Sequence, residues 1–292
     1  MPATYNTLYL DTRKRLKQAG IESPQMEAKE LVCLAAGKSR ERFYQDLSLY
    51  ASGAVEAKLE ELVSRRLTGE PVAYLVGEWE FYGLTLTVNR DVLIPRIDTE
   101  LLAERAILRA RTAGPGAHVL DLCAGSGCVG LAVAANVPGC HVVLTDLSEA
   151  ALRVCRQNIR QNGLGDQAVC ILADALAPPP NGLGEFDLVV CNPPYIPSGD
   201  ISGLDPSVRD FEPRSALDGG ADGLDFYRSV CSKWGPALRM GGSLLFEVGI
   251  GQSADVEVLL AGNGFEHIHA WQDTQGIWRV VEGMIPIRNI FS

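Results

Sequence analysis

Hydrophobic residues recur every three or four positions between residue 7 and about residue 66. The pattern begins at Leu8 and ends at Leu62 and Val63. This spacing gathers apolar side chains on one face of a helix, so it predicts a series of amphipathic helices. We therefore expect residues 1–76 to form a small all-helical N-terminal domain.

The hydrophobic period changes to two around Glu78 to Pro95. Phe81 and Leu86 belong to this alternating pattern, and Gly83 lies at a turn between them. Alternation around a turn residue is typical of a β-hairpin. Residues 77–96 are therefore predicted to form a structured hairpin that links two domains.

Short apolar runs alternate with helical stretches after Thr99. This alternation is typical of a doubly wound parallel sheet. The expected strands are His118–Leu122, His141–Thr145, Ala168–Leu172, Phe186–Cys191 and Ser243–Val248.

Two last apolar runs, Glu266–Trp271 and Ile277–Glu282, flank the short turn Asp273–Gly276. Such a pair predicts a closing antiparallel hairpin. The fold expected for residues 97–292 is therefore α/β, with a Rossmann-like doubly wound sheet that ends in a C-terminal antiparallel hairpin.

Charge and composition limit the classes of partner. The formal net charge is −10 and the hydrophobic content is 47%. An acidic balance argues against a large nucleic-acid footprint, which needs clustered Lys and Arg. Neither a secretory leader nor an apolar run of about 18 residues is evident, so we expect a cytoplasmic protein with no membrane partner.

Eight cysteines are scattered along the chain without a C-x-x-C pair or a histidine at ligand spacing. Cys170 and Cys191 lie inside apolar strand runs. We expect buried thiols rather than zinc ligands or disulfides, and no metal site.

The tetrapeptide Asn192-Pro193-Pro194-Tyr195 directly follows the fourth strand run. Prolines cannot continue a strand ladder, so their backbone carbonyls are left to face a crevice. Asn192 adds a side-chain amide and Tyr195 a flat ring. Carbonyl acceptors beside an aromatic face suit a planar amide or amino nitrogen, and no charged acid or base is required. The bland alternative is a proline-rich turn.

A small-residue loop, Cys123-Ala124-Gly125-Ser126-Gly127, follows the first strand run and precedes a helix that starts near Cys128. Small residues let the backbone approach a ligand, and a helix N-terminus offers unpaired N–H groups. Residues 125–130 also satisfy G-x-G-x-x-G, although that match alone is weak. The alternative is a tight turn without a ligand.

Two carboxylates follow the next strand runs. Asp146, about 20 residues after the loop, is placed to accept both hydroxyls of a ribose, and Asp174 could meet an adenine amino group. The alternative for Asp146 is a helix N-cap.

Together these motifs resemble those of S-adenosylmethionine-dependent methyltransferases that act on planar nitrogens. Other segments resemble one group, the peptide-chain release factor glutamine N5-methyltransferases. These segments are Arg66–Gly77, Glu80–Gly83, Val92–Arg96, Thr99-Glu100, Glu212-Pro213, Gly223–Tyr227 and Glu247–Gly249.

The chain differs from the family's usual sequence motifs at three places. Ile97-Asp98 replaces Pro-Glu, Cys123-Ala124 replaces Gly-Thr, and Asp273–Arg279 differs from Leu-Ala-Gly-x-x-Arg. The loop changes keep small residues, so the backbone geometry is expected to be retained. The last change leaves the hairpin plausible and puts substrate contacts there in doubt.

The resemblance implies transfer of a methyl group from S-adenosylmethionine to the glutamine of the Gly-Gly-Gln motif in class-1 release factors. Residues 123–127, Asp146, Asp174 and Asn192 would bind the cofactor. Asn192, Pro193 and Tyr195 would act in catalysis and, with Pro194, hold the substrate. The helical domain would help to dock the release factor.

Four segments near the expected site are ambiguous. Arg96 and Thr99 border the cofactor mouth or serve as connectors and caps, while Glu212 and Leu217–Gly223 form a lid or an ordinary surface loop.

Competing functions stay open on the sequence. A glutamine methyltransferase acting on a ribosomal protein would use the same pocket chemistry. A DNA amino-methyltransferase is disfavoured by the absence of an obvious basic recognition region. A nicotinamide-dependent oxidoreductase leaves residues 192–195 without a role, and an inactive cofactor-binding module is disfavoured by the intact tetrapeptide.

Overall fold

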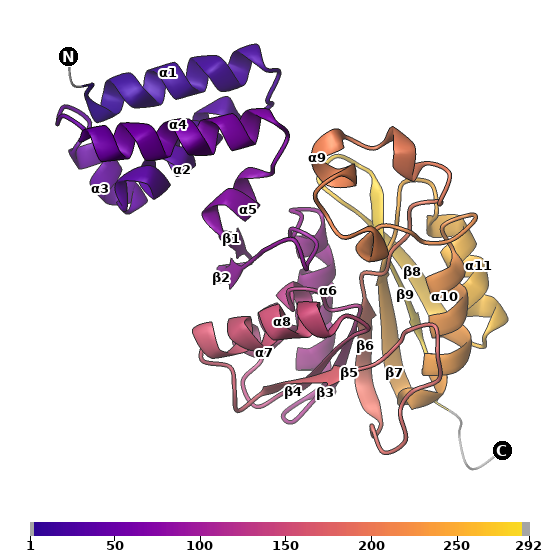
Figure 1. The fold of residues 1–292 in the computed structure, drawn as a ribbon. Helices are drawn as coiled ribbons and strands as arrows, with labels where there is room; N and C mark the ends of the chain where they lie inside the picture. Colours follow the sequence, from indigo (N-terminus) through magenta and orange to yellow (C-terminus); the bar gives the residue numbers. More distant parts are fainter. Residues whose placement is uncertain (1–2, 288–292) are drawn as a thin grey trace. The chain divides into compact units, whose positions relative to one another are not determined.

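The computed structural model describes residues 3–287. They divide into two compact units (Figure 1). The first unit holds the described residues up to Glu78 together with Asp205–Phe211, and the second holds Trp79–Leu204 and the described residues from Glu212 onward. The assignment of residues 1–76, 77–96 and 97–292 to separate domains stays a prediction.

The first unit is helical, as its sequence pattern predicts. Side chains of Thr4, Ser39 and Ser52 cap three helix N-termini by accepting a backbone N–H, which satisfies donors that the helix itself leaves unpaired. The helices are α1 Tyr5–Gln18, α2 Pro24–Ala36, α3 Arg40–Gln45, α4 Gly53–Leu67, α5 Val72–Val76 and the later segment α9 Pro206–Arg209.

The core of the helical unit is apolar, and Leu16, Leu31 and Leu62 are among its fully buried side chains. Phe211, which follows α9, belongs to the same unit. A Cβ atom on Gly69 would lie 3.3 Å from its ring. The segment 205–211 thus packs with helices far from it in sequence.

The second unit is built on a seven-stranded sheet of order β5-β4-β3-β6-β7-β9-β8. Its first five strands pair in parallel, and β9 pairs antiparallel with both β7 and β8. The strands are β3 His118–Leu122, β4 His141–Asp146, β5 Ala168–Leu172, β6 Phe186–Cys191, β7 Leu238–Glu247, β8 Glu266–Gln272 and β9 Trp278–Met284. The expected α/β fold with a C-terminal antiparallel hairpin is confirmed.

A separate two-stranded hairpin precedes the sheet. It consists of β1 Glu78–Phe81 and β2 Leu84–Thr87. Phe81 and Leu86 are buried in the same apolar cluster as the helices of one sheet face.

Helices cover both faces of the sheet (Figure 1). Val119 and Leu120 are consecutive in β3 and belong to opposite apolar clusters, as expected when strand side chains alternate between faces. One face carries α6 Thr99–Ala113, α7 Cys128–Asn136 and α8 Glu149–Gln161. The other carries α10 Asp225–Ser229, the π-helix η3 Val230–Trp234, the 3-10 helix η4 Gly235–Ala237 and α11 Ser253–Gly262. Two further 3-10 helices are η1 Ile201–Gly203 and η2 Arg214–Ala216.

The buried leucine of α4 provides a test of the helical core. Leu62 is 2% exposed, whereas Leu67 in the same helix is 41% exposed. Leu62→Ala should lower the free energy of unfolding by about 2–5 kcal/mol because it leaves a cavity. Leu67→Ala should cost about 1 kcal/mol or less. Urea unfolding, monitored by hydrogen exchange of the α4 amides, measures the change in the free energy of unfolding for each variant. Equal changes would contradict the described core.

Candidate functional site

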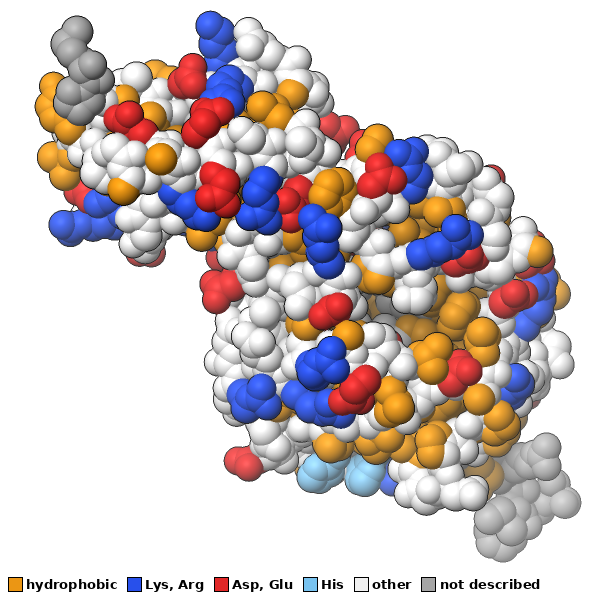
Figure 2. Space-filling model, in the orientation of Figure 1, with side chains coloured by type: hydrophobic (Ala, Val, Ile, Leu, Met, Phe, Trp, Pro, Cys, Tyr) orange, Lys and Arg blue, Asp and Glu red, His pale blue; other side chains and the backbone are white. Residues whose placement is uncertain are grey.

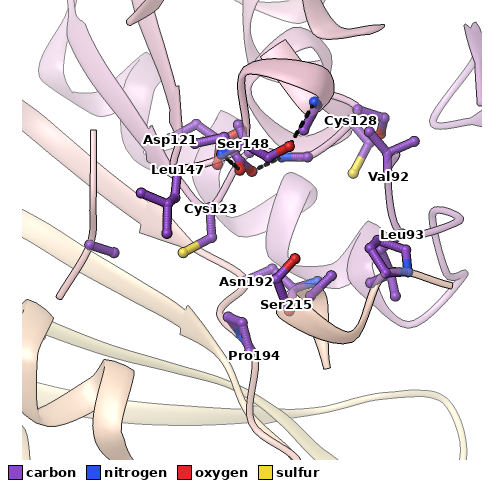
Figure 3. Close-up of a pocket in the computed structure, with 18 of the residues that line it drawn as sticks. Val92, Leu93, Asp121, Cys123, Cys128, Leu147, Ser148, Asn192, Pro194 and Ser215 are labelled. Atoms are coloured by element: carbon purple, nitrogen blue, oxygen red, sulfur yellow. Dashed lines mark hydrogen bonds between the residues drawn. The ribbon is translucent and has the colours of Figure 1, made fainter. Parts of the chain in front are cut away.

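A cavity of about 400 Å³ lies at the carboxyl ends of β3, β4 and β6. β4 and β6 flank β3 on opposite sides, and such a switch in strand order opens a ligand-binding crevice in doubly wound sheets. In the space-filling view, hydrophobic side chains gather around a hollow in the surface of the second unit (Figure 2). Leu147, Cys123 and Asn192 lie around the cavity in the close-up (Figure 3).

The loop after β3 turns sharply at the cavity wall. Cys123, Gly125 and Gly127 all have positive φ, at 59°, 55° and 84°. The Ala124 N–H donates to the Thr145 carbonyl of β4 at 2.9 Å. Cys123–Ser126 line the cavity, as the sequence predicts, whereas Gly127 does not.

The role of Gly127 in the structure is close packing. A Cβ atom there would lie 2.7 Å from Cys155 Sγ of α8. Gly130 packs equally tightly, because its Cβ would lie 2.9 Å from both Asp121 Oδ2 and Leu144 Cδ2. The glycine spacing therefore serves the packing of α7 and α8 on the sheet as well as the turn.

Asp146 closes the glycine loop from the end of β4. Its two carboxylate oxygens accept the Gly125 N–H at 2.9 Å and the Ser148 N–H at 2.8 Å. Burial raises the pKa of Asp146, and these N–H donors oppose the rise. The N-cap of α8 is Ser148, whose hydroxyl accepts the Ala151 N–H, so Asp146 is not the helix cap. Asp146 lines the cavity.

Asp121 is a cavity residue that the sequence reasoning missed. It lies inside β3, is 2% exposed and accepts the Gly130 N–H at 2.8 Å. Burial, with the nearby charge of Asp146, raises its pKa to about 7. A polar residue within an apolar strand run was the signal that could have identified it.

Asn158 of α8 was also missed, and it ties the glycine loop to the hairpin. Its buried amide donates to the Ser126 carbonyl at 2.9 Å and to the Thr87 carbonyl at 3.1 Å. Its oxygen accepts the Thr87 N–H at 2.7 Å. These three bonds fix the loop backbone against β2.

Asn192 and Pro194 line the cavity from the end of β6, but Pro193 and Tyr195 do not. Asn192 Nδ2 donates to Thr99 Oγ1 at 3.3 Å. The Tyr195 hydroxyl instead donates to Glu247 Oε1 at 3.3 Å. The tetrapeptide thus divides between the cavity wall and a buried carboxylate.

Three glycines pack closely against this tetrapeptide. A Cβ atom on Gly219 would lie 2.8 Å from the Pro194 oxygen, and one on Gly223 would lie 2.3 Å from the Tyr195 oxygen. A Cβ on Gly249 would lie 3.0 Å from the Tyr195 ring. The glycines of Leu217–Gly223, which suggested a mobile lid, are therefore explained by close packing.

Backbone bonds also tie that loop to residues after the tetrapeptide. The Ile196 N–H donates to the Leu217 carbonyl at 3.0 Å, and the Gly219 N–H donates to the Ile196 carbonyl at 2.9 Å.

Glu212 fixes the segment that forms another wall. Its carboxylate, 5% exposed, accepts the Ile94 N–H at 3.1 Å and pairs with Arg96. Arg96 and Thr99 line the cavity, in agreement with their expected place at its mouth. Asp174 also lines it and accepts the Leu176 N–H at 2.8 Å.

The residues of the C-terminal hairpin that differ from the usual family motif leave its turn intact. Asp273 Oδ1 accepts the Gln275 and Ile277 N–H groups at 2.8 and 3.0 Å. Arg279 pairs with Asp273 at 3.2 Å and with Asp98 at 2.8 Å. Ile97 is 81% exposed.

The eight cysteines are free thiols, but three are only partly buried, which corrects the expectation of uniform burial. Cys123 and Cys128 are half-buried because they line the cavity, and Cys170 is half-buried in β5 at the sheet edge. Residues 3–287 hold no cluster of three or more His, Cys, Asp or Glu placed for a metal ion. None of the helices in this range has the length and apolar character to cross a membrane.

Two family models match the chain. Residues 7–77 match the PrmC N-terminal domain, and residues 97–202 match the methyltransferase small domain. The chain is 40% identical over 274 residues to the release factor glutamine methyltransferase of Geobacter sulfurreducens, covering 94% of each protein. It is 37% identical over 286 residues to that of Caulobacter vibrioides, covering 97% of each.

Among solved structures, the hMettl16 catalytic domain in complex with a 3′UTR hairpin is similar. The TM-score is 0.56 at 15% identity, over 70% of this chain and 77% of that one. This likeness is one of fold.

The raised pKa of Asp121 predicts a pH dependence of stability. Between about pH 4 and 7 the folded state retains a proton that the unfolded carboxyl has released, so Asp121 lowers the free energy of unfolding as the pH rises. Asp121→Asn removes this contribution, and the variant should gain stability relative to the unmodified protein across that window.

Urea unfolding at a series of pH values measures the difference. Asp166→Asn, on an exposed turn, is the control and should give a parallel curve. A difference for Asp121→Asn that does not change with pH would contradict the raised pKa.

Proposed function

The chain belongs to the release factor glutamine methyltransferase family, and from this premise we propose that it methylates the N5 nitrogen of the Gly-Gly-Gln glutamine in class-1 release factors. The methyl donor is S-adenosylmethionine. The main observation in support of this proposal is a single cavity that is lined by the glycine loop, Asp146 and Asn192.

The cavity residues fit this cofactor. Each Asp146 oxygen already accepts one N–H, but a carboxylate oxygen has two lone pairs, so capacity remains for two ribose hydroxyls. The strained loop Cys123–Ser126 brings backbone rather than bulky side chains to the cavity. Leu147, 65% exposed beside Asp146, offers an apolar surface to a purine ring, and Asp174 is placed to accept its amino group. When bound, the sulfonium supplies an activated methyl group.

Asn192, Pro193 and Tyr195 are the proposed catalytic residues. An amide nitrogen is a weak nucleophile because its lone pair is delocalised into the carbonyl. Asn192 Oδ1 and the Pro193 carbonyl would accept the two N–H hydrogens, which keeps electron density on nitrogen and orients it for in-line attack. Tyr195, fixed by Glu247, and Pro194 would hold the amide plane. The methylated nitrogen is strongly acidic until it releases a proton to water, so no general base is needed.

A release factor is a macromolecule, and we propose that the helical N-terminal unit contributes to its docking. The matched family model over residues 7–77 supports a dedicated role for this unit. A glutamine methyltransferase acting on a ribosomal protein would use the same pocket, so the substrate is distinguished by direct assay.

Asn192→Ala tests the catalytic proposal. It removes the amide oxygen that would hold the substrate, so kcat should fall by about 100-fold or more, which is far more than the loss of cofactor affinity. Radiolabel transfer to a release factor gives kcat, and calorimetry gives the affinity. Asn181→Ala, in an exposed loop, is the control. A kcat for Asn192→Ala within a few-fold of that of the unmodified protein would contradict the proposal.

Asp146→Asn tests the cofactor assignment. It removes a charge that would accept ribose hydroxyls, so affinity for S-adenosylmethionine should fall by about 10- to 100-fold. Titration calorimetry measures the affinity. Unchanged binding would exclude Asp146 from the cofactor site.

A further inference from the structure

Asn158 of α8 is 0% exposed and is not one of the residues that line the cavity. Its side-chain oxygen accepts the Thr87 N–H at 2.7 Å, and its NH₂ group donates to the Thr87 and Ser126 carbonyls at 3.1 and 2.9 Å. An amide side chain carries two donor hydrogens and one oxygen. A flipped amide would therefore set its oxygen against two carbonyl oxygens. The backbone of Thr87, in the hairpin, thus fixes the direction in which the Asn158 amide donates.

The Ser126 carbonyl belongs to the peptide group that joins Ser126 to Gly127. The N–H of this peptide group donates to the Ala124 carbonyl at 2.7 Å. In a trans peptide the C=O and the N–H point in opposite directions, so Asn158 and Ala124 hold the group from both sides. Gly127 has a φ of 84°, and glycine enters positive φ about as readily as negative φ. Side-chain sterics therefore do not fix this peptide group, and its direction depends on the two hydrogen bonds.

The held peptide group is part of the cavity wall. Ser126 lines the cavity and is 2% exposed. The preceding part of the loop is held by Asp146, which accepts the Gly125 N–H at 2.9 Å. Asp146 itself lines the cavity, whereas Asn158 supports the loop from outside the cavity. A change at Asn158 can therefore move the wall without removing a group that contacts a bound cofactor.

Neighbouring side chains of α8 hold the same hairpin. Asn162 and Gln161 both donate to the Thr85 carbonyl, at 3.0 and 3.2 Å, and the Thr87 hydroxyl donates to Gln161 Oε1 at 2.9 Å. Within the described part of the chain, these two side chains form no hydrogen bond to the glycine loop. Loss of the Asn158 amide would thus leave the hairpin attached to α8 and release the loop.

We propose that Asn158 is a positioning residue for cofactor binding. Directed by the Thr87 backbone, its amide sets the Ser126–Gly127 peptide group and with it the wall against which S-adenosylmethionine binds. The inference rests on the proposed function, because it takes the cavity as the cofactor site. It makes the hairpin a support of that site.

The test compares Asn158→Leu with Asn162→Leu. Leucine has about the size of asparagine but no polar group, so each variant loses hydrogen bonds to the hairpin, and only Asn158→Leu also loses the bond to the Ser126 carbonyl. Affinity for S-adenosylmethionine, measured by titration calorimetry, should fall by about 5- to 100-fold in Asn158→Leu, the range expected when a buried acceptor loses its partner. It should fall far less in Asn162→Leu. If circular dichroism shows that Asn158→Leu does not fold, Asn158→Ala and Asn162→Ala replace the pair.

A second readout needs no cofactor. Hydrogen exchange compares the Gly127 N–H with the Val142 N–H of β4, which donates to the Gln167 carbonyl at 2.7 Å. In Asn158→Leu the Gly127 N–H should exchange about tenfold faster or more relative to Val142, because the peptide group is held from one side only. A general loss of stability would accelerate both amides alike. Asn162→Leu should leave the ratio of the two rates unchanged.

Two results would overturn the positioning role. One is equal affinity for S-adenosylmethionine in the Asn158 and Asn162 variants, and the other is an unchanged ratio of Gly127 to Val142 exchange in the Asn158 variant. Failure of the unmodified protein to bind S-adenosylmethionine would instead overturn the cofactor site of the proposed function. The exchange ratio would then still decide whether Asn158 sets the loop.

Discussion

The position of β3 between β4 and β6 is the constraint on which the rest of the second unit depends. Connections that leave β3 and β6 must run to different sides of the sheet, so a crevice opens where these strands end. The glycine loop and Asn192 enter it from these two strand ends. Without this switch in strand order, the glycine loop and Asn192 would not line a common crevice.

Buried carboxylates organise this edge of the sheet. Asp121 lies within β3, whereas Asp146 and Glu247 end β4 and β7. Each of the three receives an N–H or hydroxyl donor from a different segment. An unpaired buried charge is costly, so every such donor is held in place by the group it satisfies. The loops thus supply donors to the buried carboxylates, and these hydrogen bonds help to hold the loops in place.

Much of the fold could be predicted because a strand is indicated by the local pattern of apolar residues. His118–Leu122, Ala168–Leu172 and Phe186–Cys191 have the bounds that their apolar runs indicate. Asn192 and the loop at Gly125 were likewise predictable, because a proline pair ends a strand ladder and small residues let the backbone approach a ligand. That they line one cavity follows from parallel strands ending at a common edge.

What could not be predicted depends on contacts between distant segments. The link from Asn192 to Thr99 joins residues 93 positions apart, and no local pattern reports it. Glycines between Leu217 and Gly223 suggested mobility, but their neighbour is the backbone of Pro194 and Tyr195. Similarly, nothing in the composition of 205–211 indicates that it packs with the helical unit.

The most direct test is to incubate the protein with methyl-labelled S-adenosylmethionine and an unmethylated class-1 release factor. A release factor with alanine in place of the Gly-Gly-Gln glutamine, a ribosomal protein pool and duplex DNA are tested in parallel. The account predicts label in the release factor, located by mass spectrometry on that glutamine and absent from the alanine variant. Label that persists in the variant, or that enters only the ribosomal pool or the DNA, would contradict it.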